Sequence, residues 1–171
     1  GYFPEDDRVF YSADQGGNEL SHLYVREVDG TARDLTPGEE HQAQFGGWAG
    51  DYTGFWVWTN ERNPQFYDLY WYDAASYERE MVFQNDAGYM PGDISRDGRW
   101  LAISKVTSNA DDDIYVVDLR MGGEPDHVTP HEGDVSHGVN GFTPDSSRLY
   151  FTSNADSEFS RVWSHELYSG E

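Results

Sequence analysis

The chain contains no cysteine and only one lysine, Lys105, and each shortage excludes certain kinds of site or partner. Without cysteine it forms no disulfide bond, carries no thiolate nucleophile and offers zinc no sulfur ligand. Its 11 basic residues against 32 acidic residues give a formal net charge of −21. Nucleic-acid phosphates and anionic membrane surfaces repel a chain of this charge, so we expect neither as a partner.

Long hydrophobic runs and helical periodicity are also missing. No stretch approaches the ~20 apolar residues of a membrane-spanning helix. Aromatic residues, in contrast, make up 16% of the 171 residues. That content is too high for a disordered chain, which lacks the apolar surface to offset the entropy of ordering. The composition therefore predicts one folded domain with a buried core.

A repeat organises the chain. Four segments each combine an aromatic or aliphatic residue, a short polar turn and an apolar run; they are 2–12, 48–59, 94–104 and 142–152. A second set follows at 22–28, 68–74, 113–119 and 161–167, and a third at 34–38, 81–85 and 127–131. All three sets recur at the same spacing, so the repeat is the primary guide to the fold.

The repeated segments have the character of β-strands. They are short, rich in β-branched and aromatic residues, and bounded by Gly, Asp, Asn and Pro. Asp97-Gly98 and Asp145-Ser146 fit tight hairpin turns, which need residues that tolerate positive φ. Four antiparallel strands recurring every ~45 residues indicate an all-β β-propeller. The run 55–58 is apolar on both faces, as expected between neighbouring blades; a sandwich of meanders is the alternative architecture.

Strand counting predicts a partial propeller, with two full four-stranded blades and two partial ones. The blades cover approximately 1–40, 41–86, 87–133 and 134–171 of a single propeller segment. Closed propellers have ~4–8 blades, so we expect a fragment of a larger propeller. Such a fragment exposes apolar blade faces, which tend to associate. We therefore expect a homo-oligomer, with two copies closing a ring of about eight blades as one arrangement.

Particular motifs point to a family. The turns at 94–102 and 142–150 resemble those of WD-like propellers such as the TolB type, and 113–119 is similar to a third strand of the same group. Segments 22–38 and 128–145 more specifically resemble the N-terminal β-propeller of prolyl oligopeptidase-family serine peptidases. That family includes dipeptidyl peptidases and acylaminoacyl peptidases.

The resemblance implies a function. In these peptidases the propeller covers a separate α/β-hydrolase domain, admits peptides and excludes folded proteins, while the hydrolase domain carries the catalytic serine, aspartate and histidine. We therefore expect no catalytic, cofactor-binding or metal-binding residues in this chain, no cofactor, and a parent protein that is a serine peptidase. A TolB-like protein-binding propeller of the bacterial envelope is the main alternative, and a propeller enzyme with its own central site is a third.

The location of the protein is predicted only by the resemblance and the missing cysteines. Together these favour the periplasm or secretion, with the cytoplasm as the alternative. The acidic residues are scattered through every loop rather than clustered. Scatter favours a solvated acidic surface suited to salt over a cation site or a steering field. We therefore expect a halophilic or marine source and stability that rises with salt.

The closest approach to a serine nucleophile motif is at 133–138. A nucleophile elbow reads G-x-S-x-G, but Asp134 occupies the first glycine position. Ser136 and His137 are also adjacent, and neighbouring strand residues point to opposite faces. This geometry argues against a nucleophile–base pair at Ser136.

Two sets of polar residues could bind a metal ion, namely the aspartate-rich segments and the histidines. Asp111–Asp113 and the similar segment 153–158 are rich in oxygen ligands that suit calcium, although a solvated hairpin loop between the second and third strands fits better. The six histidines are His22, His41, His127, His131, His137 and His165. His127 and His131 would need a third ligand to bind zinc. We favour a structural role for His131 and His137, as hydrogen-bonding partners of neighbouring strands.

One aromatic group has two interpretations. Phe66, Tyr67, Tyr70, Trp71 and Tyr72 could line a ligand surface or form an interface between blades. The interface is favoured, because large aromatic side chains are what neighbouring blades need for packing.

Overall fold

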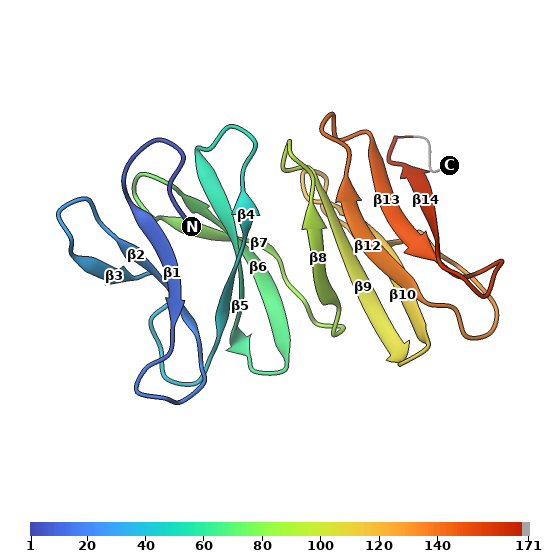
Figure 1. Ribbon diagram of the computed structural model, residues 1–171, viewed down its shortest axis with the longest axis horizontal. Helices are drawn as coiled ribbons and strands as arrows, with labels where there is room; N and C mark the ends of the chain where they lie inside the picture. Colours follow the sequence, from blue (N-terminus) through green and yellow to red (C-terminus); the bar gives the residue numbers. More distant parts are fainter. Residues whose placement is uncertain (169–171) are drawn as a thin grey trace. The chain divides into compact units, whose positions relative to one another are not determined.

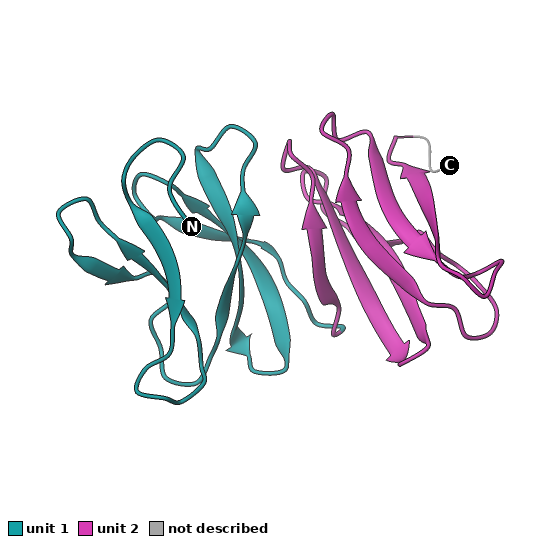
Figure 2. Ribbon diagram, viewed as in Figure 1, with its two compact units in different colours: residues 1–87 teal, residues 88–171 magenta. Residues whose placement is uncertain are grey.

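A computed structural model describes residues 1–168. The chain forms two compact units, residues 1–87 and 88–171 (Figure 2). Over the described residues the chain consists of β-strands and loops, with no helix. The strands form four antiparallel sheets, two in each unit, and every sheet follows the order of the sequence (Figure 1). No helix in residues 1–168 is long and apolar enough to cross a membrane.

The first unit holds a three-stranded and a four-stranded sheet. The first sheet comprises β1 (Val9–Ala13), β2 (His22–Arg26) and β3 (Ala32–Asp34). The second comprises β4 (Ala43–Trp48), β5 (Gly54–Asn63), β6 (Phe66–Asp73) and β7 (Arg79–Phe83).

The second unit also holds one sheet of each size. Its four-stranded sheet comprises β8 (Met90–Ile94), β9 (Trp100–Ser108), β10 (Asp111–Asp118) and β11 (Asp126–His127). Its three-stranded sheet comprises β12 (His137–Phe142), β13 (Arg148–Ser153) and β14 (Arg161–Glu166). The predicted all-β architecture of two full and two partial antiparallel blades is therefore confirmed.

The core of the first unit lies between its two sheets. Residues 55–58 of β5 are all buried, as their apolar character on both faces predicts. Phe55 and Val57 belong to one apolar cluster with Phe3 of the N-terminal segment and Phe10 of β1. The ring centroids of Phe10 and Phe55 are 4.7 Å apart in an edge-to-face arrangement, which aromatic pairs favour. Aromatic packing therefore joins these two blades.

The aromatic residues of β6 contribute to the same packing. Tyr70 and Tyr72 are buried, whereas Phe66, Tyr67 and Trp71 are half-buried. The Tyr72 hydroxyl donates a hydrogen bond to the Leu35 carbonyl of the preceding blade at 3.3 Å. The predicted interface role is confirmed for Tyr72.

In the second unit, a carboxylate joins the neighbouring sheets. Asp93 in β8 accepts the Phe142 amide of β12 at 3.0 Å through its Oδ2 atom. Just before it, a Cβ placed on Gly92 would lie 2.3 Å from the Ala102 carbonyl oxygen of β9. Glycine is required at this position because β8 and β9 approach too closely for a side chain.

The turns between β4 and β5, β8 and β9, and β12 and β13 have the same local structure. Asp51, Asp97 and Asp145 occupy equivalent positions, and each accepts the amide hydrogen of the residue two positions later. The residue directly after each aspartate has positive φ: 61° at Tyr52, 68° at Gly98 and 58° at Ser146. Glycine adopts this conformation readily, whereas a bulky side chain makes it unfavourable. Tyr52 is therefore the unusual member of the set.

Candidate binding site

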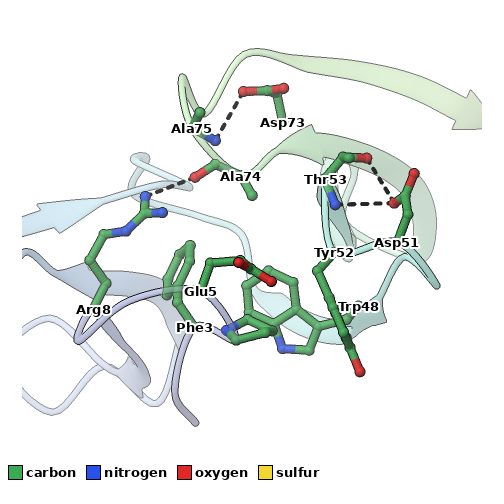
Figure 3. A pocket seen from close by; sticks show the side chains of 11 residues that line it. Phe3, Glu5, Arg8, Trp48, Asp51, Tyr52, Thr53, Asp73, Ala74 and Ala75 are labelled. Carbon is green, nitrogen blue, oxygen red and sulfur yellow. Dashed lines mark hydrogen bonds between the residues drawn. The ribbon is translucent and has the colours of Figure 1, made fainter.

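A cavity of about 550 Å³ lies in the first unit, where the N-terminal segment meets two turns of the four-stranded sheet (Figure 3). Its volume falls in the range of small-ligand sites, which is about 300–1,000 Å³. Its lining comes from the N-terminal segment, the β4–β5 turn and the β6–β7 turn: Phe3, Pro4, Glu5, Arg8, Trp48, Asp51, Tyr52, Thr53, Asp73, Ala74 and Ala75.

Three aromatic side chains form the apolar part of the lining. The ring centroids of Phe3 and Trp48 are 5.0 Å apart, and those of Trp48 and Tyr52 are 6.5 Å apart, both in edge-to-face arrangements. Phe3 is buried, whereas Tyr52 keeps 43% of its surface exposed. The aromatic wall therefore extends from the core to solvent.

The guanidinium of Arg8 is held by groups of the protein itself. Its Nε and Nη2 atoms donate to the Asp6 carboxylate, and Nη1 donates to the Ala74 carbonyl at 2.8 Å and the Tyr77 hydroxyl at 2.7 Å. It also stacks on the Phe3 ring, 4.0 Å from the centroid. The hydrogen bond to Asp6 raises the pKa of Arg8. Arg8 thus joins the N-terminal segment to the β6–β7 turn.

The remaining charges of the lining are negative. Hydrogen bonds from Thr53 lower the pKa of Asp51, and those from Ser76 lower the pKa of Asp73, so both are ionised at neutral pH. Glu5 is exposed and, within residues 1–168, has no hydrogen-bond or ion-pair partner. In Figure 3 its carboxylate lies between Phe3 and Tyr52. Glu5 is the carboxylate in the lining that is most available to a ligand.

A second polar cluster occupies the second unit, where the aspartates singled out in the sequence meet three histidines. Asp111–Asp113 form the start of β10 and are half-buried, so the expected solvated loop between the second and third strands is wrong for them. The His131 Nε2 atom lies 2.8 Å from Asp111 Oδ1, and His127 Nε2 lies 2.6 Å from Asp113 Oδ1. These histidines hold the carboxylates against the sheet, which explains the difference.

The structural role predicted for His131 and His137 is confirmed. His131 Nδ1 donates to the Thr129 carbonyl at 2.9 Å, and His137 Nδ1 donates to the Asp112 carbonyl. The two rings lie 5.1 Å apart. Among residues 1–168, no group of three His, Cys, Asp or Glu side chains is arranged to hold a metal ion.

The first unit has a related histidine pair. His22 is fully buried, and its Nδ1 atom lies 2.9 Å from Asp34 Oδ2. Its ring is parallel to that of His41 at 5.1 Å, and His41 Nε2 donates to the Thr36 carbonyl at 2.9 Å. These bonds occupy His22 and His41 in holding the loop after β3. His165 lies on β14, and burial lowers its pKa.

Ser136 and His137 do not form a nucleophile–base arrangement. The Ser136 amide donates to Asn154 Oδ1 at 2.8 Å, and the His137 ring is directed to the Asp112 carbonyl. Gln42 and Asn60 repeat the Ser136–Asn154 bond in the first unit at 2.6 Å. This recurrence identifies Ser136 as part of the blade architecture.

The comparisons with known proteins agree with the fold. Residues 2–170 match the family described as "Prolyl oligopeptidase, N-terminal beta-propeller domain". The chain belongs to this family. Dipeptidyl aminopeptidase BIII of Pseudoxanthomonas mexicana is 30% identical over 176 residues, which cover 98% of this chain and 24% of that protein. The chain thus spans about a quarter of the length of this curated relative.

Solved structures show the same propeller fold. A structure from a study of two prolyl endopeptidases aligns with a TM-score of 0.69 at 16% identity, covering 96% of this chain and 26% of that one. TolB from Acinetobacter baumannii aligns with a TM-score of 0.62 at 17% identity, covering 96% of this chain and 40% of that one. At these identities the likeness concerns the fold alone.

The sequence interpretation missed the cavity residues of the first unit. Their chemistry comes from three separated segments, so no local motif contains them. One signal was present in the repeat, because Tyr52 stands where the equivalent turns have Gly98 and Ser146. A bulky aromatic residue at a turn position that favours glycine could have marked this turn as unusual.

Proposed function

We propose that this chain is a non-catalytic part of a serine peptidase, in which its propeller gates and positions peptide substrates for a separate α/β-hydrolase domain. The observation that carries the proposal is the family match over residues 2–170. The dipeptidyl aminopeptidase relative, which is about four times as long as the matched region, supports it. The parent protein's location in the periplasm or outside the cell belongs to the same proposal.

The proposed mechanism is steric and electrostatic. Central strands are buried along much of their length, β5 over Gly54–Asn60 and β9 over Trp100–Ile103, which favours rigid blades. A rigid ring of blades admits an extended peptide and excludes a folded domain, while its net charge of −21 favours basic peptides over acidic ones. Bond cleavage takes place in the hydrolase domain, so the described residues of this chain supply no nucleophile.

Separate peptidase assays of this chain and of the complete protein test whether catalysis belongs to the hydrolase domain alone. We expect the chain alone to release no chromophore from a dipeptidyl p-nitroanilide, whereas the complete peptidase hydrolyses it. The control is the complete peptidase with the nucleophilic serine of its hydrolase domain replaced by alanine, which should be inactive. Turnover by the chain alone, or a parent protein with no hydrolase domain, would overturn the proposal.

A further inference from the structure

We propose that the cavity of the first unit binds an organic cation, namely the guanidinium group of an arginine side chain in a peptide. The lining lies wholly within residues 3–75, and the proposal does not depend on the proposed peptidase function. The proposal depends on three features of the cavity: its aromatic walls, its charge and the strained turn that carries Tyr52.

The walls have the chemistry that planar cations bind. A guanidinium group is attracted to the face of an aromatic ring, with tryptophan the most favourable partner. Phe3, Trp48 and Tyr52 line the cavity together. The chain's own arginines make this contact, since Arg8 lies 4.0 Å from the Phe3 centroid and Arg99 lies 4.5 Å from the Trp100 centroid.

The charge of the cavity selects the sign of the ligand. Glu5, Asp51 and Asp73 contribute three carboxylates to the lining, and Arg8 is its only basic residue. Asp6 neutralises Arg8 through hydrogen bonds from Nε and Nη2, while Nη1 is directed to Ala74 and Tyr77. Arg8 therefore has little capacity left to attract an anion. The Asp51 and Asp73 carboxylates are tied to their turns, so Glu5 is placed to pair with the incoming cation.

The turn that carries Tyr52 differs from its equivalents in the side chain that it presents. Tyr52 has a φ of 61°, which is unfavourable for a bulky residue. The equivalent turns contain Gly98 and Ser146, so the turn does not require an aromatic side chain. The strain instead places the Tyr52 ring at the cavity, 6.5 Å from Trp48 and partly exposed.

The test measures binding of N-acetyl-arginine amide to the chain by calorimetry at low salt. The neutral comparison is N-acetyl-citrulline amide, which keeps the shape but loses the charge. We expect the arginine probe to bind at least about tenfold more tightly, and tetramethylammonium, which has no planar face, to bind more weakly than arginine. Equal affinity for the citrulline probe would overturn the proposal, and tighter binding of tetramethylammonium would overturn the assignment to guanidinium.

Two variants locate the binding. Tyr52→Gly should weaken binding of the arginine probe roughly three- to thirtyfold while leaving the melting temperature unchanged or raised, because glycine relieves the positive φ. Glu5→Gln should weaken binding without unfolding, since Glu5 is exposed. The matched controls are Tyr150→Ala, at a tyrosine of similar exposure in β13, and Glu39→Gln in an exposed loop. Unchanged affinity in Tyr52→Gly and Glu5→Gln, or an equal loss in the controls, would overturn the proposal.

Discussion

His131 and Asp111 are joined by a hydrogen bond of 2.8 Å between Nε2 and Oδ1, while the other ring nitrogen of His131 faces a carbonyl oxygen. A carboxylate and a carbonyl are both acceptors, so both nitrogens of His131 must carry a proton to satisfy these bonds. The hydrogen bonds to Thr129 and Asp111 raise the pKa of His131 above its usual value. The surroundings of His131 at β10 thus favour its charged form.

This arrangement predicts a pH-dependent contribution to stability. Because the folded protein raises the pKa of His131, the stabilisation is fully present below the unfolded pKa of about 6.5 and is lost as pH rises through the folded pKa. His131→Gln should therefore lower the free energy of unfolding more at about pH 6 than at about pH 9. Urea unfolding of both proteins across this range provides the measurement.

The groups that face His131 define the control. Asp113 Oδ1 lies 3.3 Å from its Nδ1 atom and is shared with His127, and the His137 ring lies 5.1 Å away. His127→Gln removes a neighbouring, more exposed histidine that also contacts Asp113, and so controls for the loss of an imidazole from this cluster. A stability difference between wild type and His131→Gln that does not change with pH would contradict the charged state of His131.

The two units use one polar pair with the residue types exchanged. In the first unit, the residue before Leu23 is His22, and it pairs with Asp34. In the second unit, the residue before Ile114 is Asp113, and it pairs with His127. The histidine and the aspartate have thus changed places. The equivalence is fixed because the amides of Leu23 and Ile114 each donate to the threonine two residues after the partner, at 3.0 and 2.8 Å.

We therefore predict that an exchange in the first unit is tolerated only as a pair. His22→Asp alone places two carboxylates together at a buried site, and should lower the free energy of unfolding by about 3 kcal/mol. Adding Asp34→His should recover at least half of that loss. A double-mutant cycle from urea unfolding supplies the coupling free energy. Additive losses would show that the two positions are independent.

The close contact between Gly38 and His41 predicts a second pair of coupled substitutions. A Cβ on Gly38 would lie 2.0 Å from the His41 ring, which is fixed by stacking on His22 and by its bond to Thr36. Gly38→Ala should cost about 1–3 kcal/mol, the usual cost of overpacking. In a His41→Ala background the same change should cost much less. An equal loss in both backgrounds would show that His41 is not the obstacle.

The fold was predictable from the repeat because every blade uses the same local chemistry. The apolar run 55–58 and the turn residues Asp97 and Asp145 identify strands and hairpins without long-range information. The partners of Asp111–Asp113 were not predictable in this way, since the bonds to His131 and His137 span about 20–25 residues. The cavity depends on three separate segments, which only the folded chain brings together.

The exposed apolar residues of the second unit predict self-association. Phe159 and Val162 are 77% and 69% exposed, and Trp163 on β14 is partly exposed. Burying such side chains against a second copy is favourable. We expect sedimentation to show concentration-dependent oligomers, and Phe159→Ser with Val162→Lys to shift the chain towards monomer. Met121→Ser changes an equally exposed side chain elsewhere and is the control; a wild-type monomer at all concentrations would refute the prediction.

The excess of acidic residues predicts stability that increases with salt. A net charge of −21 opposes the compact state through self-repulsion, and salt screens that repulsion. We expect the melting temperature to rise from about 0.1 M to about 2 M KCl. Sucrose at equal osmolarity is the control for general exclusion effects. A melting temperature that is flat or falls with KCl would contradict the proposed adaptation to salt.

The most direct test of the central claim is the size selectivity of the proposed parent peptidase. The measurement is the ratio of its rates on a short chromogenic peptide and on a folded protein that contains the same cleavable sequence, with the propeller present and with it removed. Gating predicts a high ratio that falls towards one when the propeller is absent and the hydrolase domain remains folded. The same ratio in both proteins would show that these blades do not select the substrate.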